Sequence, residues 1–365
     1  MYLHSSTFIF RSAYLVIAVL LITACAAAPT AMAVPTATTI PTPAPTPTME
    51  PAVDAFTMNQ RLGHAVNLAN ALEAPNEGDW GLTLKAEYFQ LAHQAGFTAV
   101  RIPIRWNAHA GASAPYTITP EFFKRIDWVI DQAFSNQLAV VLDFHNYDEL
   151  MSDPGNNTAR FLGIWKQIAE HYQNYPNTLV FELLNEPNSQ LGASTWNTVI
   201  ASVLPVVRAS NPTRNIVIGP AQYNNMDALK DLKLPADDQH IIVTFHYYAP
   251  FQFTHQGAEW VTGSSSWLGT VWKGKSSEKQ YVDFDFNEVA QWAKENKRPI
   301  FLGEFGAYSK ADMTSRALWT TYIAREAEKL GFSWSYWEFG AGFGVYDPTA
   351  QKWNEPLLEA LIPKP

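Results

Sequence analysis

Short apolar runs alternate with longer amphipathic stretches along the chain from about residue 54 onward. Runs of this length, rich in Val, Ile and Phe, are typical of buried strands, whereas the stretches between them have the spacing of helices. The pattern predicts eight strands, at residues 64–70, 97–104, 138–146, 178–186, 214–221, 240–248, 298–305 and 332–339.

Two of the stretches between predicted strands carry clear helix signals. One begins with Thr119 as the expected N-cap, Pro120 at the first helical position and Glu121 in the first turn. Another, at residues 312–331, ends at Gly331, which is a common helix stop.

Eight strands, each followed by a helix, predict an α/β protein of the (β/α)₈ TIM-barrel type. A doubly wound open sheet is the alternative. However, no glycine-rich phosphate loop follows the first predicted strand, and the chain has no P-loop. We see no internal repeat and no second folded domain in the pattern, so we expect a single barrel.

The residues before the barrel have a different character. Arg11 precedes an apolar run that ends at Cys25, which is typical of a secretory signal and too short for a comfortable membrane span. "ITAC", at residues 22–25, also resembles the bacterial lipobox, in which the cysteine becomes lipidated. Cleavage after "AMA", at residues 31–33, is the alternative. We therefore expect an exported protein, either a cell-surface lipoprotein or an extracellular one.

Residues 26–53 consist largely of Ala, Pro and Thr, a composition that cannot build a core and favours an extended tether. The expected organisation is therefore a signal peptide at residues 1–25, a linker at 26–53 and one folded domain at 54–365.

Composition narrows the classes of partner. Charged residues make up only 16% of the chain and the net charge is −9 without a basic block, which argues against nucleic acid. The chain has 13 Trp, 15 Tyr and 21 Phe, which suits a flat, neutral ligand such as a sugar ring but also a large core. Cys25 is the only cysteine, so a monomer has no internal disulfide, and a monomer is what we expect.

Polar residues collect where seven of the eight predicted strands end. In a (β/α)₈ barrel the carboxyl ends of the strands form the catalytic face. One such residue would be explained as a buried polar group or a helix cap, but a series of them indicates a site. The residues are Asn67, Arg101, His145, Asn185, Glu186, His246, Tyr248, Glu304, Trp337 and Glu338.

Two glutamates stand out in this series. Glu186 ends "FELLNE" and Glu304 ends "IFLGE", on the predicted fourth and seventh strands. Two carboxyl groups that face each other across a barrel mouth suit glycoside hydrolysis. The alternative is that either one is a solvated charge at a strand end. Two histidines beside two glutamates also raise the question of a metal, but no His-x-x-x-His or His-x-His pair is present, and we expect neither a metal nor another cofactor.

The ordered set of motifs resembles glycoside hydrolase family five, the retaining cellulase-like barrels. The resemblance extends over nearly all of residues 56–362 and is closest to bacterial endo-β-1,4-glucanases that also act on mannan, with residues 70–81, 250–260 and 342–347 looking almost the same. It rests on "VRIPIRW", "LDFHN", "ELLNEP", "FHYY", "LGEFG" and "YWEFG".

The resemblance implies roles for individual residues. Glu186 would be the general acid and then the general base, and Glu304 would be the nucleophile. Asn185 would hold the 2-hydroxyl group of the sugar, while Arg101 and Tyr248 would keep Glu304 ionised and oriented. The other side chains implied at this subsite are His145 and His246, which would line it, and Trp337, which would be its stacking platform.

Several further positions remain open. Trp260 could form the wall of a leaving-group subsite or anchor its loop on the barrel. Asn67, Glu73 and Trp80 could contact sugars further along the cleft. Asn146 stands where many relatives carry a second histidine, which leaves the preference between glucose and mannose open.

Three hypotheses about function follow. The first is a retaining endo-acting enzyme that cleaves cellulose-like or mixed-linkage β-1,4-glucan. The second is an endo-β-1,4-mannanase, or one enzyme for both backbones, with xyloglucan as a further substrate. The third is a non-catalytic glycan-binding lipoprotein, against which the presence of both Glu186 and Glu304 argues.

Overall fold

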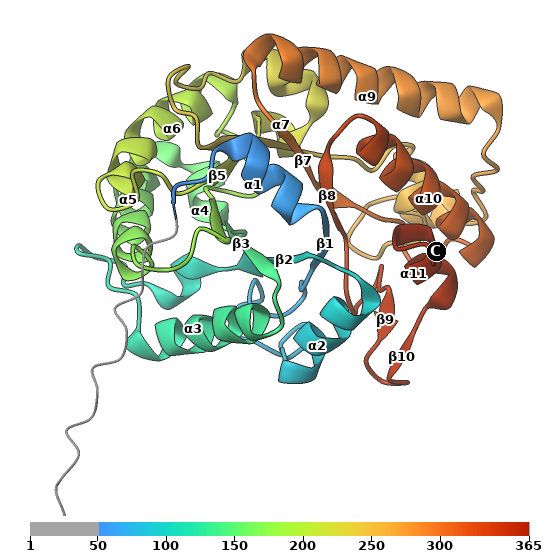
Figure 1. Cartoon of the computed structure of the whole chain (residues 1–365), viewed down its shortest axis with the longest axis horizontal. Helices are drawn as coiled ribbons and strands as arrows, with labels where there is room; N and C mark the ends of the chain where they lie inside the picture. Colours follow the sequence, from blue (N-terminus) through green and yellow to red (C-terminus); the bar gives the residue numbers. More distant parts are fainter. Residues whose placement is uncertain (1–50, 365) are drawn as a thin grey trace, which may run out of the picture. The chain divides into compact units, whose positions relative to one another are not determined.

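The computed structural model describes residues 51–364, and its eight main strands form one closed barrel of parallel strands in sequence order. Figure 1 shows the helices arranged around this barrel. All eight predicted strands are present, and the (β/α)₈ prediction is confirmed. The strands are β1 (His64–Asn67), β2 (Ala99–Ile104), β3 (Ala139–Phe144), β4 (Leu179–Glu182), β5 (Ile216–Ile218), β6 (Ile241–His246), β7 (Ile300–Phe305) and β8 (Ser333–Tyr336).

Six of the eight strands end before the predicted residue, most clearly β4, whereas β2 and β7 end at the predicted residue. Leu183 and Leu184 are buried and continue the apolar pattern, but the backbone leaves the strand conformation after Glu182. Glu186 then has a φ of +47°. The apolar pattern reports burial rather than backbone conformation, so it overestimated the length of this strand.

The larger helices lie between consecutive strands, as the pattern predicted. They are α2 (Ala86–Ala95), α3 (Pro120–Ser135), α5 (Pro154–His171), α6 (Ala193–Arg208), α9 (Ser276–Asn296) and α10 (Met313–Lys329). Helix α3 begins at Pro120 as expected, although the side chain of Thr119 makes no capping hydrogen bond. Helix α10 ends just before Gly331, which has the expected positive φ of +76°.

Shorter elements complete the described chain. They are α1 (Ala55–Leu62), α4 (Asp148–Ser152), α7 (Ala221–Asn224), α8 (Phe251–Thr254), α11 (Glu355–Leu361), the 3₁₀ helices η1 (Trp106–His109), η2 (Met226–Asp231) and η3 (Ser264–Trp267), and a two-stranded sheet of β9 (Tyr346–Asp347) and β10 (Lys352–Trp353).

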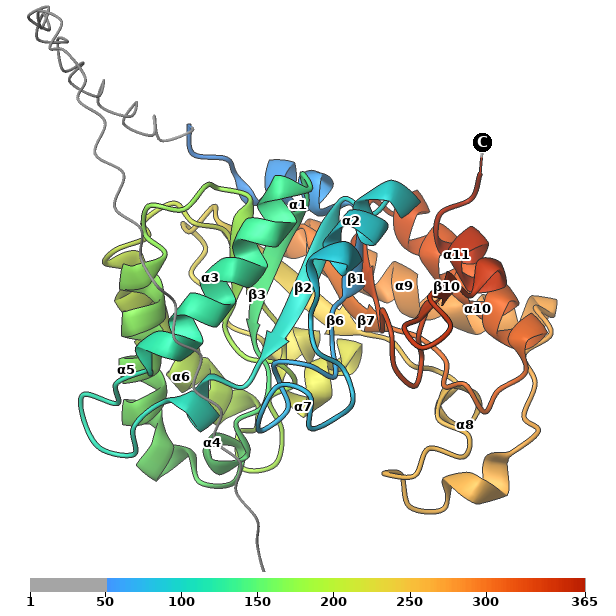
Figure 2. The ribbon, with the colours of Figure 1, turned by 90° about the horizontal axis from the view of Figure 1, so that it is seen from below.

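The apolar interior is divided by the barrel wall. A large core fills the space between strands and helices, and a smaller one fills the barrel itself. Met58 and Leu62 of α1 belong to the inner core, together with strand residues such as Val141 and Phe301. Helix α1 therefore closes the amino-terminal end of the barrel. Figure 2 shows α4, α7 and α8 at the opposite end, toward which β2 and β3 point.

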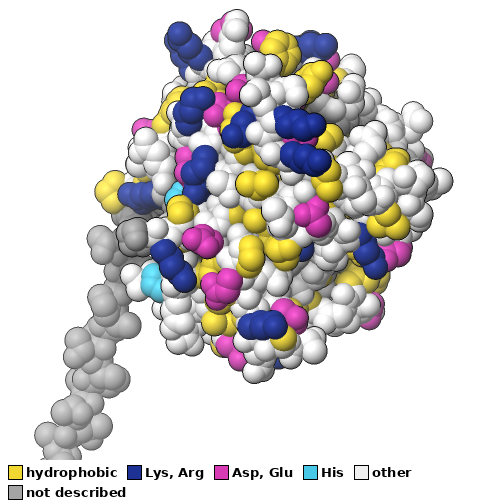
Figure 3. Space-filling view, turned by 90° about the vertical axis from the view of Figure 1, so that its right-hand side faces the viewer, with side chains coloured by type: hydrophobic (Ala, Val, Ile, Leu, Met, Phe, Trp, Pro, Cys, Tyr) yellow, Lys and Arg dark blue, Asp and Glu magenta, His cyan; other side chains and the backbone are white. Residues whose placement is uncertain are grey.

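The chain enters the domain at the closed end. The backbone oxygen of Pro51 accepts a hydrogen bond from Asn177, and that of Val53 accepts one from Asn215. The expected signal peptide at residues 1–25, Cys25 and nearly all of the expected linker at 26–53 lie outside the described residues. Within residues 51–364, no helix is both long and apolar enough to cross a membrane. On the face seen in Figure 3, basic and acidic side chains are interspersed.

Candidate active site

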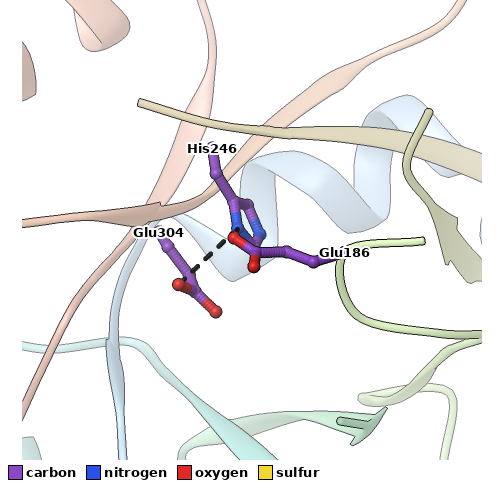
Figure 4. A group of neighbouring side chains, drawn as sticks. All are labelled: Glu186, His246 and Glu304. Carbon is purple, nitrogen blue, oxygen red and sulfur yellow. Dashed lines mark hydrogen bonds and ion pairs between the residues drawn. The ribbon is translucent and has the colours of Figure 1, made fainter. Parts of the chain in front are cut away.

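Glu186 and Glu304 meet at the open end of the barrel. Glu304 lies in β7 and Glu186 in the bend after β4, while His246 is the last residue of β6. His246 is paired in register with Glu304, at a point where the ladder between β6 and β7 is irregular. Because parallel strands end at the same edge, segments far apart in sequence deliver these side chains to one place, as Figure 4 shows.

The two carboxyl groups are close. One oxygen of Glu186, one of Glu304 and a ring nitrogen of His246 all lie within 4.8 Å of one another. His246 Nδ1 is 2.8 Å from Glu186 Oε1 and 3.6 Å from Glu304 Oε2. Carboxyl groups roughly 5–5.5 Å apart are typical of retaining glycosidases, whereas inverting enzymes leave a wider gap for water.

Glu304 is held by two strong donors. Arg101 Nη1 donates to its Oε1 at 2.8 Å, and the Tyr248 hydroxyl donates to its Oε2 at 2.9 Å. The side chain is only 6% exposed. The buried guanidinium and the phenol each donate to one carboxylate oxygen and so fix the orientation of the side chain.

Arg101 is itself enclosed by acceptors. Its Nε and Nη2 donate to both oxygens of Glu182, at 2.7 and 3.0 Å, and Asp143 Oδ2 lies 3.0 Å from Nη2. Asn67 and Asn185 each accept one further bond at 2.9 Å through their side-chain oxygens. The guanidinium therefore joins three carboxylates and two amides into one buried network.

This network corrects the expected sugar contact of Asn67 and agrees with the expected support of Glu304 by Arg101. Asn67 and Arg101 have no exposed surface, and the Asn67 amide is occupied by Arg101, Gly303 and Ser335. Neither side chain can touch a substrate from there. These two polar side chains lie beneath the cleft, where Asn67 accepts a hydrogen bond from Arg101 and Arg101 donates one to Glu304.

Asp143 and Glu182 were missed by the sequence reasoning. Both are fully buried, and burial raises the pKa of both carboxyl groups, that of Asp143 to about 7. Each interrupts an apolar strand, in "VVLDF" and "LVFE". A charge inside such a run signals a buried partner, since an unpaired charge there would be very costly. The two charged residues are visible in the sequence, but they were interpreted only as positions within a strand.

Glu186 lies in a different environment. Loss of hydration raises the pKa of its carboxyl group to about 7, although 28% of the side chain remains accessible from the cleft. Its protein partner is His246, whose own pKa burial lowers to about 4. A neutral imidazole therefore faces Glu186, which can carry a proton near neutral pH.

His145, Asn185 and Trp337 form the adjoining wall. His145 Nδ1 contacts Asp143 Oδ2 at 2.6 Å, and its Nε2 lies 3.4 Å from Asn185 Nδ2. The rings of His145 and Trp337 are stacked, with centroids 5.6 Å apart and planes 8° from parallel. With Glu186, Glu304 and Tyr248 these residues line a cavity of about 430 Å³.

Trp260 stands between two cavities. Its side chain is 61% exposed and packs edge-on against Tyr308. It lines the cavity that contains Glu304 and Trp337, and also a second one of about 660 Å³ that contains Glu186 but not Glu304. The two cavities adjoin, because both are lined by Glu186, Tyr248, His255 and Trp260. The contact with Tyr308 agrees with an anchored loop residue, whereas a wall of a leaving-group subsite stays a prediction for Trp260.

The first loop is only partly as expected. Glu73 is 1% exposed, and its carboxylate accepts bonds from the backbone amides of Asn70 and Ala71, so its expected sugar contact is wrong. Trp80 is 45% exposed and lines the smaller cavity. Asn146 is half-buried and donates to the backbone oxygen of Glu73 at 3.2 Å, which supports the loop.

Glu186, His246 and Glu304 also have a spacing that a small cation could bridge. Their ligand atoms are already engaged, however: Arg101 and Tyr248 donate to Glu304, and His246 Nδ1 lies 2.8 Å from Glu186 Oε1. The guanidinium beside Glu304 supplies the positive charge that a cation would bring. We assign no metal to this group.

Known proteins share this arrangement. The family described as "Cellulase (glycosyl hydrolase family 5)" matches residues 63–342. Endoglucanase H of Acetivibrio thermocellus is 35% identical over 318 residues, which cover 85% of this chain. The chain spans about a third of that relative, 34% of its length.

Solved structures agree with the sequence comparison. The endoglucanase Cel5A of Thermotoga maritima is 52% identical, with a TM-score of 0.84 over 85% of this chain and all of that one. The same enzyme has been solved in complex with cellobiose and with mannotriose. Cellulose synthase subunit Z of Clostridioides difficile is 39% identical, with a TM-score of 0.80 over 82% of this chain and 99% of that one.

Proposed function

The chain belongs to glycosyl hydrolase family 5, and we propose from this membership and the geometry above that it is a retaining endo-β-1,4-glucanase. The observation that carries the proposal is that Glu186 and Glu304 lie close together but have different partners. Glu304 accepts a hydrogen bond from the Arg101 guanidinium, whereas Glu186 contacts the His246 imidazole. Double displacement at a sugar requires an acid and a nucleophile, and Glu186 can hold a proton while Glu304 accepts bonds from a guanidinium and a phenol.

In the first step, Glu304 attacks the anomeric carbon and forms a glycosyl ester, while Glu186 gives its proton to the departing glycosidic oxygen. In the second step, the Glu186 carboxylate takes a proton from water, whose oxygen attacks the anomeric carbon and releases Glu304. Asn185, held by Arg101, is positioned to bond the sugar 2-hydroxyl group. Tyr248 and Arg101 orient Glu304 throughout.

Trp337 and His145 form the surface on which the attacked sugar would lie, with Trp80 further along. The second cavity, beside Glu186 and bounded by Trp260, would take the leaving sugars. Two adjoining open cavities that are both lined by Glu186 favour cleavage inside a polymer over removal of end units.

The mannotriose complex of the Thermotoga relative supports a second substrate class for this chain. We propose that it cleaves β-1,4-mannan as well as β-glucan. Asn146 supports the first loop from outside the cavity lining and would influence this preference through Glu73.

The test is release of reducing ends from carboxymethyl-cellulose, barley β-glucan and galactomannan by the full chain, with Glu304→Gln in parallel. Activity on the glucans that the variant lacks is the expected result. Newly formed ends followed by proton NMR should appear first as the β-anomer. Loss of all three activities in a folded wild-type protein would revive the glycan-binding alternative, and an α-anomer would overturn retention.

We propose that the protein is exported and acts as a monomer, anchored by lipid on Cys25. The basis is the sequence of residues 1–25, which lies outside the described structure. Mass spectrometry of the mature amino terminus distinguishes a lipidated Cys25 from cleavage after residue 33. A Cys25→Ser variant should be released from the membrane fraction in the first case only.

A further inference from the structure

A strained turn borders the site at the end of β5. Gln222, Tyr223 and Asn224 have φ values of +61°, +64° and +53°, so three successive residues with side chains are left-handed. Left-handed backbone is unfavourable for residues that carry a Cβ atom, and it occurs routinely only at single positions. Strain of this kind persists where the surroundings enforce it, which happens most often at functional sites.

The turn is fixed to the loop that carries Glu186. The backbone amide of Tyr223 donates to the oxygen of Pro187 at 3.2 Å. Asn224, in turn, is fully buried, and its Nδ2 lies 3.2 Å from His246 Nε2. The strained backbone therefore directs one amide side chain onto the imidazole that contacts Glu186.

Gly219 makes room for this amide. A Cβ atom on Gly219 would lie 2.1 Å from Asn224 Oδ1, far inside contact distance. Oδ1 has no hydrogen-bond partner among the described residues. The amide is thus arranged for the bond from Nδ2 to His246, at the cost of an unpaired oxygen.

This bond determines where the proton of His246 lies. An amide N–H that donates to Nε2 requires a lone pair there, so a neutral imidazole carries its proton on Nδ1. Nδ1 is the atom 2.8 Å from Glu186 Oε1. We propose that Asn224 is a positioning residue, which holds His246 as the neutral Nδ1–H tautomer and so lets Glu186 alternate between acid and carboxylate. The inference rests on the proposed function of Glu186.

The choice of an amide matters because of the charges around it. A carboxylate at position 224 would favour a proton on Nε2 and an imidazolium ring, and that cation would hold Glu186 ionised. The other charged or titratable groups around His246 and Glu186 are Glu304 on β7, Arg101 on β2, Asp143 on β3, Glu182 on β4, His145 after β3 and Tyr248 after β6, and Asp227 and Asp285 line the same cavity.

Asn224→Asp tests the proposal, with the nitrogen resonances of His246 and the pH profile of kcat/KM as readouts. In the wild type, NMR should show a neutral ring protonated on Nδ1. In the variant, Nε2 should carry a proton, and the alkaline limb of kcat/KM should move down by about one pH unit or more. For a shift of one unit, activity at pH 7 would fall about fivefold, and it would be recovered at lower pH.

Asn225→Asp is the matched control, because it adds the same charge at the next residue. Asn225 is exposed and its side-chain oxygen caps η2 by accepting from Asp227, a role that Asp also fills. It should leave the His246 tautomer and the alkaline limb in place. Gly219→Ala is a second route to the same end, since its methyl group should displace Asn224 and produce a mixture of His246 tautomers.

The proposal is overturned if His246 stays neutral and Nδ1-protonated in folded Asn224→Asp while the alkaline limb does not move. It is equally overturned if Asn225→Asp shifts the limb as much as Asn224→Asp. A wild-type protein with the expected tautomer but no activity on any glucan or mannan would instead overturn the proposed function. The NMR readout needs no substrate, so the two failures are distinguishable.

Discussion

The carboxylate of Glu304 receives hydrogen bonds from a buried guanidinium and a phenol, whereas that of Glu186 faces a single imidazole. Glu304 thus lies in a setting with a permanent positive charge. Glu186 lies in one without, and its pKa is raised to about 7. Two identical side chains a few ångströms apart become chemically different because one shares a cation and the other shares a neutral ring. The comparison teaches that roles are set by the partners rather than by the residue type.

The largest effect should follow removal of the charge that Arg101 stabilises. Glu304→Gln should lower kcat on barley β-glucan by about 10⁴-fold or more, since no other side chain can form the glycosyl ester. Thermal unfolding of the variant serves as the control for folding. A variant that retained the parent rate would show that Glu304 is not the nucleophile.

Glu186→Gln should remove the general acid, and its effect should depend on the leaving group of the substrate. Hydrolysis of β-glucan should fall about 10²- to 10⁴-fold, the usual contribution of general acid–base catalysis. Formation of the glycosyl-enzyme from an aryl cellobioside with a dinitrophenolate leaving group should be affected much less, because that group departs without a proton. Equal losses on both substrates would contradict the assignment of Glu186 as the acid.

Tyr248→Phe should weaken the Glu304 setting without removing it. A hydrogen bond to a charged group contributes about 1.5–3 kcal/mol, so kcat/KM should fall about 10- to 100-fold. The hydroxyl group binds Glu304 and not Glu186, hence the alkaline limb of the pH profile should keep its position. A shift of that limb with little loss of rate would place the influence of Tyr248 on the acid instead.

The difference between Glu186 and Glu304 can also be tested without a mutation, through the pH dependence of wild-type activity. The Glu186 pKa is raised from 4.5 to about 7, so its acid form prevails below that value and is lost above it. Activity measured as kcat/KM should fall about tenfold for each pH unit above 7. The free energy of unfolding should also decrease with rising pH. The stabilising contribution of the Glu186 carboxyl group is fully present below pH 4.5 and is lost as pH rises through 7. Activity undiminished at pH 9 would contradict a titrating Glu186.

The sequence predicted the barrel and the residues of the site well. It did not predict which of those residues face the cleft and which are buried beneath it. Eight apolar runs identified all eight strands, and the polar strand ends identified Glu186, His246 and Glu304 as neighbours. Polarity at a strand end does not distinguish a side chain that faces the cleft from one beneath it. Asn67 and Glu73 were therefore expected at the sugar, although burial and hydrogen bonding keep them away from it.

The supporting network was the part that could not be assembled from the sequence. Asp143 and Glu182 belong to different strands, and both converge on Arg101 from a third. Single charges within apolar runs indicate that partners exist, but not which ones. The left-handed turn at Asn224 could not be predicted either, because none of its three residues with positive φ is a glycine.

Helix α1 and the hydrogen-bonded backbone of Pro51 and Val53 lie at the opposite end of the barrel from Glu186 and Glu304. Any pull transmitted along the chain from upstream of Pro51 is therefore borne by the closed end. The open cleft at the other end of the barrel bears none of that pull.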